Sequence, residues 1–335
     1  MSPDVLPEFI RQLLDPLAYP HPAGEVGLVQ THISYVLLAG DYVYKFKKPV
    51  DFGFLNFTTM AKRRYFCEQE LLLNRRLCPT IYLDLVTMNG NGVPVLNGPG
   101  PVIEYGIKMK RMPADRMMDK IIRAGLLTAD MLEAVVDTLV PFYIKADSTE
   151  RHFGTAQAVG INVLENFAQI QEFVGGEAIR AEQFELLSNF SHRFLEHEEI
   201  FEQRIAAGRI HDCHGDLHSG NICLADQVYI YDCIEFNQRF RYCDVASDVA
   251  FLAMDLDYHG CSQLSTYFID YFQRAAYDDS LLEVLNFYKC YRAAVRGKIN
   301  LFTAAAPEVD AVTRDRCLEK AGRYFRLAEN YAKIA

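Results

Sequence analysis

Residues 211–221 read His-Asp-Cys-His-Gly-Asp-Leu-His-Ser-Gly-Asn and form the stretch around which the rest of the chain is organised. Within it, Asn221 follows Asp216 after a short loop. A loop of this length presents a carboxylate and an amide to the same side, where the carboxylate can accept a proton from a hydroxyl group. The amide oxygen is the kind of ligand that Mg²⁺ takes while keeping several waters. The stretch therefore predicts a base next to a metal ligand.

A β-hairpin is predicted directly after this stretch. Residues 222–224 read as a short strand, residues 225–227 as a turn and residues 228–231 as the return strand. Asp232 follows immediately. A hairpin turns the chain back on itself, so we expect this second carboxylate to return to the same metal ion.

The pattern His-Gly-Asp-Leu-His-x-Gly-Asn, a hairpin and then an aspartate resembles the aminoglycoside phosphotransferase and choline kinase group of the protein-kinase-like fold. Protein kinases have H-R-D-x-x-x-x-N at this place, with Gly215 here replacing the arginine. The resemblance implies an α+β, two-lobed fold. The small lobe has an antiparallel sheet plus a helix, and the large lobe is mainly helical and carries the catalytic hairpin.

The same resemblance assigns roles to residues of this region. It implies that ATP and Mg²⁺ are the cofactors, that Asp216 is the catalytic base, and that Asn221 and Asp232 hold the metal. His214 is expected to support the loop through backbone hydrogen bonds. Asp248, in an Asp-Val-Ala-Ser-Asp segment that also matches the group, is expected to brace it.

The small lobe is predicted to supply a lysine and a glutamate. Lys45 directly follows the apolar run of the third predicted strand, where a kinase keeps the lysine that binds the α- and β-phosphates. Lys47 points to the same face of the strand and is the alternative. A helix capped at Thr58 or Thr59 and running to Leu77 carries the partner glutamate, Glu70 rather than Glu68. Its buried stripe is predicted to be Tyr65, Leu72, Leu73 and Leu77.

Two further nucleotide contacts are predicted from position alone. Thr31 and Ser34 belong to the loop expected above the phosphates, although an ordinary tight turn explains this stretch equally well. Backbone groups around Met109 are expected to bind the adenine edge, in a hinge at 108–113. The expected lobes are residues 1–110, which bind nucleotide, and residues 111–335, which carry catalysis and acceptor binding.

A helical insert over about 161–206 is expected to cover the acceptor site, as two helices at 162–174 and 177–206. Its many carboxylates suggest attraction of a cationic acceptor, although a solvated helix face is the commoner explanation. Farther along, Arg292, Arg296 and Lys298 lie on one predicted helix. They face either an anionic acceptor or the region of Asp244, and structural ion pairing is favoured.

Composition limits the remaining function classes. The net charge of −10 argues against a nucleic-acid surface. No window of 18 apolar residues occurs and residues 1–15 do not resemble a signal peptide, so no membrane association is expected. Nine cysteines without a C-x-x-C pair indicate reduced thiols and a cytoplasmic location.

The resemblance implies an ATP-dependent phosphotransferase that moves the γ-phosphoryl group to a hydroxyl of a small-molecule acceptor, and the residues leave other functions open. His211, His214, Asp216 and His218 can be interpreted as the metal cluster of a hydrolase, although their order fits no familiar zinc spacing. A nucleotide-binding module without turnover and adenylyl transfer on the same fold also remain open. The run from Thr31 to Val50 resembles a bacterial subfamily often fused to a P-loop domain. This chain contains no P-loop motif, G-x-x-x-x-G-K-[ST]. By analogy with the fused relatives, the resemblance suggests a separate P-loop protein as a partner.

Overall fold

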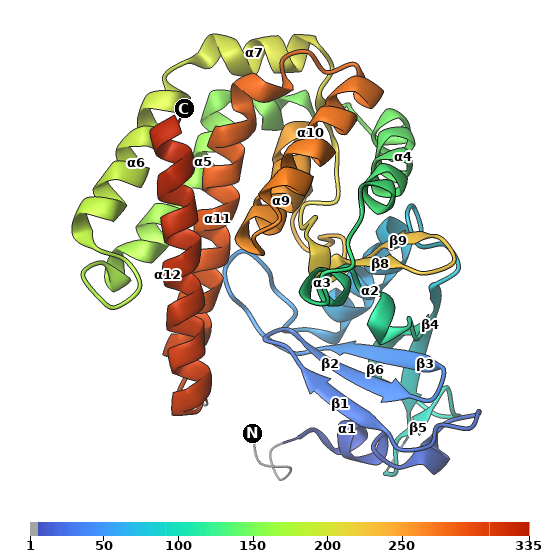
Figure 1. Cartoon of the computed structure of the whole chain (residues 1–335). Coiled ribbons are helices and arrows are strands. Elements are labelled where there is room, and N and C mark those ends of the chain that lie inside the picture. Colours follow the sequence, from blue (N-terminus) through green and yellow to red (C-terminus); the bar gives the residue numbers. More distant parts are fainter. Residues whose placement is uncertain (1–5, 91, 308, 335) are drawn as a thin grey trace. The chain divides into compact units, whose positions relative to one another are not determined.

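The computed structural model describes residues 6–90, 92–307 and 309–334, and the chain divides into two compact units (Figure 1). Unit 1 comprises Met1–Arg116 and Tyr229–Gln238, and unit 2 comprises Met117–Val228 and Arg239–Ala335. The segment Tyr229–Gln238 therefore packs with the N-terminal residues, although it follows residues 211–221 in sequence. The lobe boundary expected at residue 110 stays a prediction.

Unit 1 is built on a six-stranded antiparallel sheet with the strand order β1-β2-β3-β6-β4-β5. Two register shifts interrupt the pairing of β4 with β6. The strands are β1 (Gly27–Gln30), β2 (Ser34–Ala39), β3 (Tyr42–Lys47), β4 (Tyr82–Asn89), β5 (Val95–Leu96) and β6 (Val102–Lys110). A short helix, α1 (Glu8–Gln12), and the 3₁₀ turn η2 (Pro16–Ala18) precede them.

Strand β3 separates apolar from charged side chains by the two-residue period of a β-strand. Tyr44 and Phe46 point into the core of unit 1, where their rings are almost fully buried. Lys45 and Lys47 consequently point to the opposite face. This face is the one that receives α2, so the alternation of β3 delivers two ammonium groups to the same helix.

Helix α2 (Met60–Asn74) contacts β4 and β6. Thr59 caps its N-terminus by accepting a hydrogen bond from the backbone of Lys62. The predicted apolar stripe is wrong in part, since Tyr65 and Leu72 are exposed. Half of the buried residues of α2 are instead polar, and the buried set comprises Arg63, Cys67, Glu70, Leu71, Leu73 and Asn74.

Unit 2 is mainly helical, and its last two helices pack side by side (Figure 1). Its helices are α3 (Met118–Arg123), α4 (Ala129–Lys145), α5 (Ala156–Ile170), α6 (Ala181–Leu195), α7 (Glu198–Ala206), α9 (Val245–Tyr258), α10 (Ser262–Ala276), α11 (Leu281–Ala305) and α12 (Ala311–Ile334). The short α8 (Gln238–Arg241) lies at the unit boundary. Among the described residues, no helix combines the length and apolarity that crossing a membrane requires.

Two short strand pairs frame residues 211–221. β7 (Ile210–Asp212) pairs antiparallel with β10 (Tyr242–Asp244), directly ahead of α9. β8 (Ile222–Leu224) and β9 (Val228–Ile230) form the predicted hairpin.

The insert contains three helices, α5 to α7, instead of the two that were predicted. Helix α5 begins earlier than expected because Thr155 caps it, accepting a hydrogen bond from the backbone of Ala158. The second predicted helix is interrupted between Leu195 and Glu198, where His197 leaves helical geometry.

Candidate functional site

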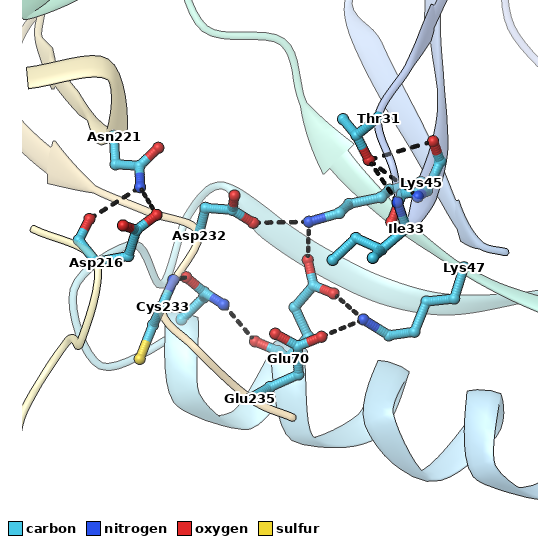
Figure 2. A network of polar contacts seen from close by, with 12 residues as sticks. Thr31, Ile33, Lys45, Lys47, Glu70, Asp216, Asn221, Asp232, Cys233 and Glu235 are labelled. Atoms are coloured by element: carbon cyan, nitrogen blue, oxygen red, sulfur yellow. Dashed lines mark hydrogen bonds and ion pairs between the residues drawn. The ribbon is translucent and has the colours of Figure 1, made fainter. Parts of the chain in front are cut away.

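Five charged side chains of unit 1 form what we call the ion-pair cluster: Lys45, Lys47, Glu70, Asp232 and Glu235 (Figure 2). The Lys45 ammonium lies 2.8 Å from Glu70 Oε1 and 2.7 Å from Asp232 Oδ1. The Lys47 ammonium lies 2.7 Å from Glu70 Oε2 and also contacts Glu235. Glu70 thus holds both lysines, and each lysine in turn holds one carboxylate of the segment Tyr229–Gln238.

Burial and charge act against each other in this cluster. Burial lowers the pKa of Lys45, but the carboxylates of Asp232 and Glu70 more than reverse this and raise it well above its ordinary value. Burial raises the pKa of Glu70, yet the two lysines lower it to about 2. Glu70 is fully buried, whereas the Asp232 side chain is 45% exposed. Lys45 and Glu70 are therefore both charged at neutral pH, and the cluster is accessible mainly at Asp232.

Backbone contacts hold Asp232 and Cys233 against α2 and β4. The Asp232 backbone N–H donates to the hydroxyl of Tyr82, and the Cys233 N–H donates to the Asn74 side chain at 2.9 Å. Asp232 itself adopts a left-handed backbone conformation with φ 63°. Aspartate tolerates this conformation better than most residues do, so the segment can turn sharply and aim the carboxylate at Lys45.

The predicted phosphate loop forms a tight turn. The Thr31 hydroxyl accepts hydrogen bonds from the backbone of Ile33 and Ser34, and the Thr31 N–H donates to the Ser34 carbonyl at 2.9 Å (Figure 2). Both amides are thus engaged inside the turn, while the Ser34 hydroxyl is buried. Met109, the predicted adenine contact, lies in β6 opposite Val43 and Tyr82. The nucleotide contacts of these residues stay predictions.

In unit 2, residues 213–221, which we call the HGD loop, are held by the carboxylate of Asp248 on α9. This fully buried carboxylate accepts hydrogen bonds from the backbone N–H groups of His214 at 2.7 Å and Gly215 at 2.8 Å, and from the Tyr143 hydroxyl. Arg292 supports the same loop by donating to the Gly215 carbonyl at 3.0 Å. Asp248 and Arg292 therefore both fix the loop backbone that precedes Asp216.

The backbone conformation at position 215 explains why a glycine occurs there. Its φ of 86° lies in the left-handed region, which a side chain disfavours. Past this bend, the Asn221 amide donates to the backbone carbonyl of Asp216 at 3.0 Å and to its carboxylate at 3.1 Å (Figure 2). The predicted base and the predicted metal ligand are therefore in contact, and the amide oxygen of Asn221 is turned away from Asp216.

The Asp216 carboxylate is ionised and partly accessible. Burial raises its pKa, but His218 and Arg296 outweigh this effect and hold the pKa well below its usual range. His218 Nε2 lies 3.5 Å from Asp216 Oδ2, and the Asp216 side chain is 32% exposed. The N–H of Asp216 donates to the ring of buried His214. His214 thus contacts the loop backbone, and its supporting role stays a prediction.

The histidines of the hydrolase hypothesis contact backbone instead of one another. His211 binds the carbonyl of Gly208 at 2.8 Å, and His218 Nδ1 accepts from the Gly220 N–H at 3.1 Å. In the part of the chain that the structure describes, no group of three or more histidine, cysteine or acidic residues is arranged to hold a metal ion. These findings do not favour a metallohydrolase.

Two contributors were missed from the sequence. Glu235 follows Asp232 by three residues and completes the ion-pair cluster through Lys47. Asp255, two turns beyond Asp248 on α9, accepts hydrogen bonds from the backbone and hydroxyl of Ser219. A carboxylate at helical spacing from Asp248 was the available signal for Asp255.

Comparison with known proteins supports the fold. No family model matches the chain. Uncharacterized proteins of Mycobacterium bovis and Mycobacterium tuberculosis are 32% identical over 305 residues, which cover 87% of this chain and 59% of theirs. The chain thus spans about three fifths of the length of the curated relatives it matches.

Two solved structures resemble this one over most of their length. An amicoumacin kinase solved with AMP-PNP, Ca²⁺ and Ami has a TM-score of 0.53 at 12% identity, covering 92% of this chain and 89% of its own. A choline/ethanolamine kinase family protein from Mesorhizobium loti has a TM-score of 0.51 at 10% identity, covering 98% of this chain and 100% of its own. The chain therefore has the protein-kinase-like α+β fold of these proteins, and the predicted fold class is confirmed.

Proposed function

We propose that the chain is an ATP-dependent phosphotransferase that moves the γ-phosphoryl group of ATP to a hydroxyl of a small molecule. The observation that carries this proposal is the contact of Lys45 with both Glu70 and Asp232. The three residues come from distant parts of the sequence, and each is of the type that a kinase uses at the corresponding place. The shared fold of two kinases supports the same conclusion.

In this proposal Lys45 binds oxygens of the α- and β-phosphates. Glu70, at 2.8 Å and fully buried, keeps the ammonium charged and in place. The ion pair of Lys45 with Asp232 would open when nucleotide binds, because phosphate oxygens replace the carboxylate at the lysine. Asp232 is then released to act as a metal ligand.

The residues present fit Mg²⁺ by their donor chemistry. Asp232 offers carboxylate oxygens, and Asn221 offers an amide oxygen that its own contacts to Asp216 leave turned outward. Mg²⁺ favours such hard oxygen ligands and keeps waters in its remaining positions. When bound, Mg²⁺ would supply neutralisation of the negative charge on the phosphate oxygens.

Asp216 is proposed to orient the acceptor hydroxyl and to take its proton. The acceptor oxygen forms a bond to the γ-phosphorus, the bond from that phosphorus to the bridging oxygen of ADP breaks, and the hydroxyl proton passes to Asp216. A carboxylate with a depressed pKa is a weak base toward an intact alcohol. We therefore expect the proton to move after most of the bond to phosphorus has formed, as a loose transition state allows.

The first test is thermal unfolding with and without Mg-ATP. Ligand at 100 times Kd stabilises a protein by about 2.7 kcal/mol, which corresponds to roughly 4 °C for a chain of this size. Asp232→Ala should weaken binding of Mg-ATP far more than binding of adenosine. An equal loss for both ligands would remove Asp232 from its role, and absence of any shift in the wild-type protein would overturn the proposal.

Turnover supplies the second test, read as ADP release with a panel of acceptors or with water. Asp216→Asn should bind Mg-ATP normally and lose about 10² to 10⁴ in kcat, the usual contribution of a positioned base. The same substitution at Asp226, exposed in the turn before β9, is the matched control. Near-normal turnover in Asp216→Asn would contradict its assignment as the base.

A cytoplasmic location is proposed on the nine cysteines, all of which are free thiols. The separate P-loop partner has no support beyond the sequence resemblance and stays a prediction.

A further inference from the structure

The guanidinium of Arg296, on α11, lies beside the HGD loop without a carboxylate partner among the described residues. Its Nη1 is 3.5 Å from His218 Nε2, and its Cζ is 5.8 Å from the ring centre of Tyr324. Its Nε is buried and has no hydrogen-bond partner. The nearest counter-charges, Asp216 and Asp255, act on Arg296 only from beyond ion-pair distance, so its guanidinium still has donors to offer to an anionic ligand.

Apart from Asp216, the carboxylates in this part of unit 2 are already engaged by other groups. Asp248 accepts from the backbone of His214 and Gly215, and Asp255 accepts from Ser219. Asp257 lies 2.6 Å from the Lys289 ammonium. None of these three carboxylates is available to a protonated amine without breaking a contact that holds unit 2 together.

Arg296 is also close to the group that we propose as the base. His218 lies between them, with its Nε2 3.5 Å from Asp216 Oδ2 and 3.5 Å from Arg296 Nη1. A small molecule whose hydroxyl meets Asp216 can therefore place a second group against Arg296. The positive charge there also contributes to the low pKa of Asp216.

A cavity of about 350 Å³ is lined by Asp257, Tyr258, Arg323, Arg326, Leu327 and Asn330, and it is connected to Arg296 only through two stacked tyrosine rings. The rings of Tyr258 and Tyr324 stack with centres 3.8 Å apart, Arg323 lies over Tyr258, and Arg296 lies over Tyr324. The Tyr258 hydroxyl is buried without a partner. This volume suits a small molecule, and the one acidic side chain in the lining is paired with Lys289.

We propose that the acceptor is an anionic alcohol, whose hydroxyl meets Asp216 and whose carboxylate or phosphate group is bound by Arg296. The inference rests on the phosphotransferase function proposed above. The planar guanidinium matches both kinds of anion with two parallel hydrogen bonds. The carboxylates of the insert suggested a cationic acceptor, whereas Arg296, which lies beside His218 and has no ion pair among the described residues, favours an anionic one.

The decisive probe is inorganic sulfate, a small anion that needs no knowledge of the natural acceptor. The full chain is first saturated with Mg²⁺ and AMP-PNP, so that sulfate does not compete at the nucleotide phosphates. Sulfate should then raise the unfolding midpoint saturably, relative to sodium chloride at equal ionic strength. Arg296→Gln should weaken the apparent sulfate affinity about tenfold, the loss expected for one charge-assisted contact.

Two further variants keep this test interpretable. Arg296→Lys retains the charge and should retain part of the sulfate effect, and Arg316→Gln, an exposed position on α12, should retain all of it. An equal sulfate response in wild-type protein and Arg296→Gln overturns the proposal, as does absence of a saturable response in the wild type. Failure of the proposed function is recognised separately, because Mg-AMP-PNP would then not stabilise the protein and sulfate would be titrated without it.

Turnover distinguishes the kinds of acceptor. ADP release is compared for D-gluconate, D-glucose and D-glucosamine, which share a carbon skeleton and differ in charge, and for glycerol 3-phosphate as the phosphate ester. We expect an anionic compound to be preferred at least tenfold over glucosamine, and this preference to disappear in Arg296→Gln. Preference for glucosamine overturns the proposal. If none of these four compounds is phosphorylated, the sulfate titration decides whether Arg296 binds an anion.

Discussion

In the ion-pair cluster of unit 1 charged side chains hold one another, whereas around the HGD loop of unit 2 carboxylates hold the backbone. The ion-pair cluster links two lysines to three carboxylates through contacts between side chains alone. The HGD loop is fixed by Asp248 and Asp255, which accept hydrogen bonds from backbone N–H groups of the loop. The two arrangements position reactive groups by different means and should fail differently.

The two arrangements differ in which group is left without a partner when one of their residues is substituted. Deleting a member of a buried ion pair leaves its partner charged and without compensation, which costs more than the lost contact. Deleting a carboxylate that binds the backbone leaves neutral N–H groups, each with a smaller desolvation penalty. The ion-pair cluster should therefore be the more sensitive to a single charge deletion, and the HGD loop should respond by loosening.

The largest effect is expected for Glu70→Ala. This change leaves Lys45 and Lys47 in the interior with their shared partner removed, and should lower the free energy of unfolding by about 3–5 kcal/mol. Urea unfolding measures it. Leu72→Ala, on the same helix with a side chain that is 63% exposed, is the matched control and should change little. A loss below about 1 kcal/mol for Glu70→Ala would mean that the cluster is not a structural element.

A smaller loss is expected for Asp248→Ala. The carboxylate binds two backbone N–H groups and the Tyr143 hydroxyl, so the unfolding free energy should fall by about 2–3 kcal/mol, near the value of a hydrogen bond to a charged group. Amide hydrogen exchange at His214 and Gly215 should accelerate at the same time. Asp270→Ala, at an exposed position of α10, should leave both measurements unchanged. Unaltered exchange at both amides would exclude Asp248 as the support of the loop.

The pH dependence of stability gives a third, still smaller effect, because protonation leaves the side chain of Glu70 in place. The two lysines hold the pKa of Glu70 at about 2, below its ordinary value of 4.5. The stabilisation is therefore present above pH 4.5 and is lost as the pH falls toward 2. Burial raises the pKa of Glu235, so its contribution has the opposite sign and changes above pH 4.5.

This effect is isolated as the difference in unfolding free energy between wild-type protein and Glu70→Gln at several pH values. The difference should be constant above pH 4.5 and should shrink below it. A difference that persists unchanged down to pH 2 would show that Glu70 is not ionised in the folded protein.

The smallest effect is expected for Glu68→Gln. Glu68 was the alternative to Glu70, but its carboxylate lies 2.9 Å from Arg64 on the exposed face of α2. An exposed pair at this helical spacing contributes about 0.3–0.5 kcal/mol and is screened by salt. Urea unfolding at low and at 1 M salt measures both properties. A loss comparable to that of Glu70→Ala would reverse the choice between the two glutamates.

Much of the fold of unit 1 could be predicted because its signals are local. Val102–Lys110 was predicted and observed as one strand, and the alternation in β3 already placed Lys45 and Lys47 on one face. The polar buried face of α2 could not be read from periodicity, since Arg63 and Glu70 are buried only because Glu104 and the two lysines neutralise them. Hydrophobic periodicity identifies buried apolar residues, but it does not identify charged residues that are buried as ion pairs.

In the candidate site, the spacing of residues in the sequence predicted which side chains are neighbours. The side chains that reach the site from distant helices could not be predicted in this way. The spacing from Asp216 to Asn221 predicted neighbours, and the two side chains are in contact. Arg296 lies many residues away, and nothing in its local sequence separates a cation without an ion pair from one that is paired. Only the three-dimensional surroundings, in which the nearby carboxylates are engaged elsewhere, make that distinction.

The return of Tyr229–Gln238 to unit 1 also sets an order of events during synthesis. When Arg116 leaves the ribosome, Lys47 has no Glu235 to meet, because that residue is translated more than a hundred positions later. At the usual 5–20 residues per second the wait is on the order of ten seconds. During that interval the nascent sheet carries an excess of positive charge beside α2, and truncation of the message anywhere before codon 235 leaves this excess permanent.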